Sequence, residues 1–147
     1  MKKFLVPAAL AAFMLAFILS ACSGAGEEAV SFADTATENF LIALSSRDYE
    51  SYKRDLSEEM LKAVPEKEFV KFSSYLEETA GEYIKGSKKL STSGIQKGMD
   101  IVVYLADYTK ESEKVRVTIV ISKKADGDYK ISGSWFDSPG IREKEYQ

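Results

Sequence analysis

The apolar positions of this chain change their period about halfway along it. In the first half they recur every three or four residues, which is typical of one buried helix face. These positions are Val30, Ala33, Thr37, Phe40, Leu41 and Leu44 in one segment, and Phe69, Phe72, Leu76 and Ala80 in another. In the second half they recur at every second residue, which is typical of half-buried strands. The chain therefore begins with helices and ends with strands.

Turn and capping residues divide the helical half into segments. We expect the first helix to begin at about Ala29, and Asp48 is a suitable N-cap for a second, short helix. A third turn or helix ends before Pro65, because the residue that precedes a proline avoids the helical conformation. Pro65 suits the first turn of a fourth helix, and Gly81 suits its C-terminal cap.

The alternating half predicts four strands that follow one another as an antiparallel meander. They cover residues 83–93, 99–108, 114–123 and 129–135, and Asp126-Gly127 indicates a two-residue hairpin before the last strand. The helices should cover the sheet face that carries the apolar side chains. We assign to that face Ile101, Val103, Val117, Ile119 and Ile131. The predicted fold class is α+β, with N-terminal helices packed on a four-stranded antiparallel sheet.

The first residues have the organisation of a secretory signal. Lys2 and Lys3 precede an apolar run over residues 4–19, and Leu19-Ser20-Ala21-Cys22 follows it directly. These four residues resemble the bacterial lipobox, Leu-(Ala/Ser)-(Gly/Ala)-Cys. The resemblance implies that Cys22 receives a thioether-linked diacylglycerol and becomes the mature N-terminus. The alternative is a retained signal-anchor helix, since the run is about as long as the shortest membrane-spanning helices.

These observations divide the chain into three parts. We expect a signal peptide over residues 1–21, a lipidated tether over residues 22–28 and a single domain over residues 29–147. The tether is composed of small and polar residues, which is typical of a flexible linker. Lipidation at Cys22 implies a location on the extracytoplasmic face of the cell membrane. Ser23 after the cysteine resembles the pattern that is sent onward to an outer membrane, in cells that have one.

Composition excludes several kinds of partner and of chemistry. The chain carries 20 basic and 23 acidic side chains, so its formal charge of −3 argues against a nucleic-acid partner. It has no histidine, which removes the usual general base near neutral pH and the commonest metal ligand. Its only cysteine is Cys22, so no intramolecular disulfide can form. We expect neither a metal nor a cofactor.

The order of elements resembles the nuclear-transport-factor-2-like, or cystatin-like, cone fold. The local similarity lies in Phe40-Leu41-Ile42-Ala43-Leu44 followed by Asp48-Tyr49-Glu50-Ser51-Tyr52, and in the closing run from Asp126 to Gly133. It covers about residues 29–136. The resemblance implies a curved sheet with a cavity between sheet and helices, where enzymes of this fold use an Asp–His dyad or an Asp/Tyr acid–base set. The absence of histidine excludes the dyad.

Four side chains are candidates for lining such a cavity: Tyr104, Asp107, Tyr108 and Trp135. Asp107 is expected on the apolar side of its strand with Leu105, where a buried carboxylate could act as a base beside a tyrosine. The alternative places Asp107 at the strand end, beside solvent. Trp135 with Phe136 either forms the floor of the cavity or closes the core.

Once Cys22 is assigned to lipid attachment, the folded domain has neither a thiol nor a histidine, which favours binding over catalysis. We expect a membrane-anchored lipoprotein whose non-catalytic domain binds a small ligand or a protein, in the sheet–helix cavity or on the outer sheet face. One alternative is a small cone-fold enzyme that uses Asp107 and a neighbouring tyrosine as acid and base. Another is a structural or stress-related envelope lipoprotein without a small ligand.

Overall fold

The computed structural model describes residues 24–144, so the predicted signal peptide and Cys22 lie outside the described part of the chain. Four helices come first: α1 (Glu27–Ser46), α2 (Tyr49–Lys53), α3 (Glu58–Ala63) and α4 (Glu66–Thr79). Four strands follow: β1 (Lys89–Gln96), β2 (Met99–Ala106), β3 (Val115–Lys123) and β4 (Tyr129–Asp137). A short helix, α5 (Pro139–Glu143), comes after them. The predicted order of helices and strands is confirmed.

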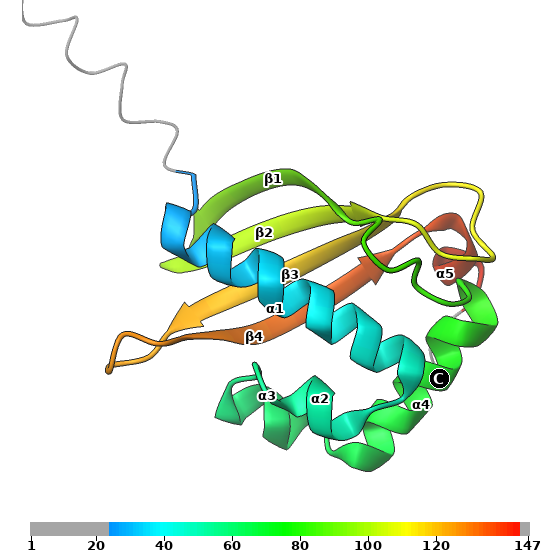
Figure 1. Cartoon of the computed structure of the whole chain (residues 1–147), viewed down its shortest axis with the longest axis horizontal. Coiled ribbons are helices and arrows are strands. Elements are labelled where there is room, and N and C mark those ends of the chain that lie inside the picture. Colours follow the sequence, from blue (N-terminus) through cyan, green and yellow to red (C-terminus); the bar gives the residue numbers. More distant parts are fainter. Residues whose placement is uncertain (1–23, 145–147) are drawn as a thin grey trace, which may run out of the picture.

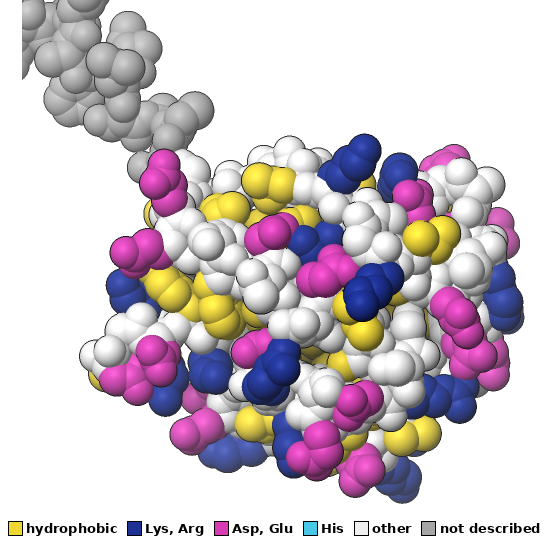
Figure 2. Space-filling model, in the orientation of Figure 1, with side chains coloured by type: hydrophobic (Ala, Val, Ile, Leu, Met, Phe, Trp, Pro, Cys, Tyr) yellow, Lys and Arg dark blue, Asp and Glu magenta, His cyan; other side chains and the backbone are white. Residues whose placement is uncertain are grey.

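The helices lie on one face and along one edge of the sheet. The strands pair as an antiparallel meander in the order β1-β2-β3-β4. Figure 1 shows α1 crossing the face of the curved sheet, while α2, α3 and α4 gather beside β4. The fold is therefore α+β, as the two periods predict. On the face seen in Figure 2, acidic and basic side chains are interspersed and neither sign dominates.

Local signals in the sequence mark three helix ends correctly, at Asp48, Pro65 and Gly81. The Asp48 side chain accepts a hydrogen bond from the Ser51 N–H at 3.1 Å, which is the predicted N-cap of α2. α4 begins directly after Pro65. Gly81 follows α4 with a φ of 86°, and its N–H donates to the Leu76 carbonyl at 3.0 Å.

The start of the fold lies closer to Cys22 than we expected. α1 begins at Glu27 instead of Ala29, Ala25 packs against the core, and the Gly26 N–H donates to Asp100 Oδ1 at 3.3 Å. Residues assigned to the tether by their small and polar character thus belong in part to the domain.

The first predicted strand is displaced. Tyr83 forms only an isolated bridge with Tyr108, and the chain then turns at Gly86, where φ is 77°. Regular pairing begins at Lys89 and continues to Gln96. The last hairpin is also longer than two residues, because the Lys124 N–H donates to the Asp128 carbonyl at 2.7 Å across the turn.

The face of β2 that meets the helices is the opposite of the predicted one. Val102, Tyr104 and Ala106 are fully buried in the core, while Ile101 and Val103 lie on the other side. The register explains this result: Val102 pairs with Ile119 and Tyr104 with Val117, and paired residues share a face. Val117, Ile119 and Ile131 do face the helices, as predicted.

We call the side away from the helices the outer face. Its apolar members are Met99, Ile101, Val103, Leu105, Val120 and Trp135. β2 is apolar at nearly every position from Ile101 to Ala106, so its own pattern did not distinguish the two faces. The orientation of β2 is set by its pairing with β3, whose apolar and polar residues alternate.

Candidate functional site

The two candidate tyrosines of β2 and its continuation lie in the core. Tyr104 is fully buried and Tyr108 is 3% exposed, and neither hydroxyl has a hydrogen-bond partner among the described residues. Burial raises the pKa of both phenols above the ordinary value of 10.0. The hollow that Tyr108 lines has a volume of about 10 Å³, which is too small for a ligand. These side chains pack the fold where the sequence predicted a cavity.

Asp107 lies beside solvent, as the alternative interpretation had it. Its carboxylate forms an ion pair with Lys114 at 2.6 Å, and its side chain is 40% exposed. Within residues 24–144, no hydrogen bond joins this carboxylate to Tyr104 or Tyr108. The assignment of Asp107 to the helix-facing side was wrong. Asp107 lies two residues after Leu105 and so shares its side of the chain, and Leu105 pairs with Arg116 on the outer face. The acid–base pair is not assembled.

Trp135 and Phe136 have separate roles. Phe136 faces the core, where its ring lies 5.4 Å from that of Phe72 and 6.4 Å from that of Phe40. Trp135 lies on the outer face and is 61% exposed. Its ring rests against Gly133, because a Cβ added there would lie 3.1 Å from the ring. Because Gly133 has no side chain, the indole can pack directly against the backbone of the sheet.

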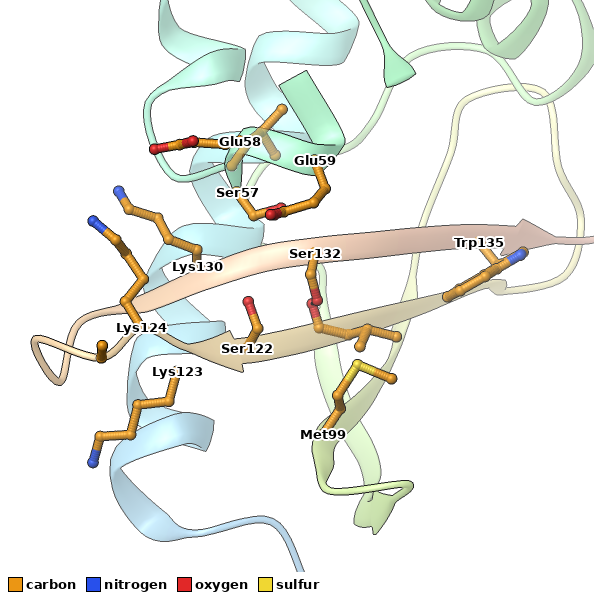
Figure 3. Close-up of a pocket in the computed structure, with 13 residues that line it drawn as sticks. Ser57, Glu58, Glu59, Met99, Ser122, Lys123, Lys124, Lys130, Ser132 and Trp135 are labelled. Carbon is orange, nitrogen blue, oxygen red and sulfur yellow. The ribbon is translucent and has the colours of Figure 1, made fainter. Parts of the chain in front are cut away.

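Trp135 is part of a groove of about 750 Å³, which we call the outer-face groove. The start of α3 forms one side, and the β3–β4 hairpin forms the other. The lining residues are Leu56, Ser57, Glu58, Glu59, Met99, Val120, Ser122, Lys123, Lys124, Ala125, Lys130, Ser132 and Trp135. Figure 3 shows Trp135 at one end, Lys124 and Lys130 at the other, and the two serines of the strands between them.

Two further hollows meet the outer-face groove at Trp135. One, of about 340 Å³, extends over the outer face toward β1 and is lined by Met99, Ile101 and Val120, among others. The other, of about 440 Å³, lies between β4 and the helices α3 and α4. Trp135 lines all three, so the exposed indole stands at their junction.

The charged rim of the outer-face groove carries both signs, with Glu58 and Glu59 beside Lys123, Lys124 and Lys130. Lys124 lies 3.3 Å from an oxygen of Asp126, and Lys123 lies 4.0 Å from Glu28. Lys130 donates from Nζ to the Arg54 carbonyl at 3.2 Å. Within the described residues no cluster of acidic or cysteine side chains could hold a metal ion. The site offers an apolar floor with a polar rim.

The sequence analysis selected Trp135 but missed the rest of this site. Lys130, Ser132 and Met99 line the groove without any distinctive motif around them. One signal was present: Gly133 stands two positions before Trp135, so the two share a face of the strand and the glycine leaves room for the ring.

A family model described as "Protein of unknown function (DUF3887)" matches residues 37–133, about two thirds of the chain. The chain belongs to this family. The match runs from the middle of α1 to Gly133, so it includes α2 to α4, the first three strands and the glycine beneath the Trp135 ring. No curated protein and no solved structure matches the chain. Over residues 24–144, no helix has both the length and the apolar character needed to cross a membrane.

Proposed function

We propose that this member of the DUF3887 family is a lipid-anchored binding protein of the cell envelope, and that its ligand lies over Trp135 on the outer sheet face. One observation carries the binding site: a 61% exposed indole stands where three hollows meet. A tryptophan offers a large apolar surface and one N–H donor, and such residues commonly dominate binding energy. The groove volume of about 750 Å³ falls in the usual range for ligand sites.

The anchor is supported by the lipobox-like Leu19-Ser20-Ala21-Cys22 and by the place where the fold starts. Ala25 already packs against the core, close to Cys22 in the sequence. An acyl chain on Cys22 would hold the domain against the membrane with little slack. The ligand would therefore be a molecule of the envelope or of the space next to it.

The proposal includes a cone-like fold of the nuclear-transport-factor-2-like type. Its support is a long first helix across a curved, four-stranded antiparallel meander. The site differs from the one that this resemblance implies, because the space between sheet and helices is packed around Tyr104, and the open grooves lie on the outer face and along the β4 edge. We propose no acid–base chemistry for Asp107, since its carboxylate pairs with Lys114 away from both tyrosines.

Photo-crosslinking tests the binding site directly. Trp135 is replaced by the photoreactive amino acid p-benzoylphenylalanine in the full-length chain, and cells are irradiated. Leu90 is the matched control, because it is a similarly exposed apolar side chain (51%) that lines none of the hollows described above. We expect a discrete adduct from position 135 and none from position 90. Equal labelling from both positions, or none from position 135, would contradict the proposal.

A further inference from the structure

The free edge of β4 already pairs with one short extended segment, around Leu56. The Ile131 N–H donates to the Asp55 carbonyl at 2.8 Å, and the Ser57 N–H donates to the Ile131 carbonyl at 2.8 Å. Leu56 between them forms a parallel bridge with Ile131. This extended segment ends at once, because Ser57 is the N-cap of α3 and the helix leads the chain away. The rest of the β4 edge is left without a strand among the described residues.

The hollow of about 440 Å³ lies along this remaining edge. Ser132, Gly133, Ser134 and Trp135 all line it. Successive side chains of a strand point to opposite faces, so a hollow that touches four residues in a row lies against the edge and not on one face. We call it the edge groove.

Backbone groups point into the edge groove. Ile131 turns its N–H and carbonyl outward, and β4 has a one-residue bulge at Ser132, opposite Val120 and Ile121. Pairs in an antiparallel ladder alternate between bonded and non-bonded, so after the bulge Ser134 is the next residue whose N–H and carbonyl turn outward. No hydrogen bond of the described residues satisfies these two groups. They are a ready donor and acceptor for another backbone.

The opposite wall of the edge groove is apolar. It is formed mainly by Met60 and Val64 from α3 and its end, and by Phe72 from α4. Glu68 is the one acidic residue in this lining, and no basic side chain lines it. The wall therefore suits apolar side chains and favours a neutral or basic ligand over an acidic one.

We propose that an extended peptide of neutral or basic charge binds in the edge groove by adding to β4 as a strand. Its backbone pairs with Ser134, continuing the line begun by Asp55–Ser57. Its side chains alternate between the indole of Trp135 on the outer face and the wall of Met60, Val64 and Phe72. This inference rests on the proposed function, because it names the ligand class of the site around Trp135.

The other free edge of the sheet does not offer the same site. β1 is exposed along most of its length. The hollow beside it has a volume of about 240 Å³ and is lined by β1 and β2 residues only. Lys89 also stands at the start of this edge, and an edge lysine discourages pairing with another strand. Only the β4 edge combines free backbone groups with a facing wall among the described elements.

The test uses a displayed library of linear heptapeptides and the chain from Ser23 to Gln147, which keeps every described residue. Each peptide that is enriched on this protein is synthesised in two forms. In one form the backbone nitrogens of the odd-numbered residues are methylated, and in the other those of the even-numbered residues. Methylation blocks donation from one edge of the peptide only. Because Trp135 is the only tryptophan, its fluorescence emission reports binding near it. Ser134→Pro removes the outward N–H, and Ser134→Ala is its matched control with the N–H kept.

We expect neutral or basic peptides with alternate apolar residues to enrich. Methylation of one set should weaken binding about tenfold or more and methylation of the other set less than about twofold, since two backbone hydrogen bonds are at stake. Ser134→Pro should weaken binding to a similar extent, whereas Ser134→Ala should not. Peptides that bind near Trp135 but tolerate both methylation patterns would overturn strand addition and leave the proposed function standing. If no peptide bound the wild-type protein better than the Ser134→Pro variant, the inference would be overturned. The crosslink from position 135 would still decide the proposed function.

Discussion

At the scale of single residues, two neighbouring tyrosines show how partners decide what a buried hydroxyl contributes. The ring centroids of Tyr83 and Tyr108 lie 5.7 Å apart. The Tyr83 hydroxyl donates to Glu38 at 2.8 Å and accepts from the Lys88 N–H at 3.3 Å. The Tyr108 hydroxyl is buried without a partner among the described residues. The Tyr83 hydroxyl is thus hydrogen-bonded, whereas the Tyr108 hydroxyl has lost contact with water without gaining a hydrogen bond among the described residues.

Removing each hydroxyl should therefore have opposite consequences. We expect Tyr83→Phe to lower the free energy of unfolding by about 1–3 kcal/mol, because it breaks a hydrogen bond to a carboxylate. Tyr108→Phe should leave that free energy unchanged or raise it by up to about 1 kcal/mol, because it removes an unpaired polar group. Urea denaturation of both variants measures the difference. An equal loss in Tyr108→Phe would show that its hydroxyl has a partner.

Tyr83 also predicts a loss of stability at high pH. Burial, and secondly the hydrogen bond to Glu38, raise the pKa of this phenol from 10.0 to about 12. A group whose pKa is higher in the folded state adds stability that is fully present below its unfolded pKa and is lost above it. The free energy of unfolding should therefore fall as the pH rises from about 10 toward 12.

Denaturation at a series of pH values, followed by circular dichroism, tests this. Burial raises the pKa of Tyr52, Tyr104 and Tyr108 as well, so the decline should continue beyond the Tyr83 contribution. In Tyr83→Phe the slope between about pH 10 and pH 12 should be shallower than in the wild type. An unchanged slope would mean that Tyr83 titrates normally in the folded protein.

At the scale of elements, two glycines with the same backbone conformation differ in their surroundings. Gly81, after α4, has a φ of 86°, and a Cβ there would lie 2.8 Å from the Lys110 nitrogen and meet the Thr109 side chain. Gly86, in the turn before β1, has a φ of 77° and no atom within 4 Å of an added Cβ. The loop after β2 thus packs directly on the end of α4, whereas the turn at Gly86 is open.

Alanine at these two positions separates backbone strain from steric clash. Gly86→Ala should lower the free energy of unfolding by about 1–2 kcal/mol, the cost of a left-handed conformation for a residue with a Cβ. Gly81→Ala should cost more, about 3 kcal/mol or above, because the clash with the backbone of Lys110 adds to that strain. Thermal and urea denaturation of the two variants measure the comparison. Equal losses would show that the Thr109–Lys110 segment moves away freely.

At the scale of the whole molecule, the proposed position of the domain at the membrane rests on lipidation of Cys22. We expect the full-length chain, expressed in bacteria, to incorporate an alkyne-labelled fatty acid and to sediment with membranes. Cys22→Ser should lose the label entirely, because a hydroxyl does not form the thioether. Ser23→Ala is the matched control and should keep it. Labelling that persists in Cys22→Ser would point to another acylation site, whereas a full-length chain that sediments with membranes without any label would point to a retained signal-anchor helix.

Features that depend on neighbours in the sequence could be predicted, and features that depend on distant contacts could not. Asp48, Pro65 and Gly81 mark helix ends through interactions within one turn, and the sequence located all three. Asp107 was placed on the wrong face because the orientation of β2 follows from its register with β3. The edge groove needed α3, α4 and β4 together, and these are far apart along the chain.

The sequence by itself determined the α+β class, the order of the elements and the selection of Trp135 as a candidate, because period and capping are local properties. Only the tertiary structure decided which side of the sheet is open. Tyr104 fills the inside because the register turns it toward α1, and Trp135 lies outside because the bulge at Ser132 shifts the parity of β4 by one residue. A shift of one residue exchanges the two faces of a strand, and no pattern within β4 alone reveals it.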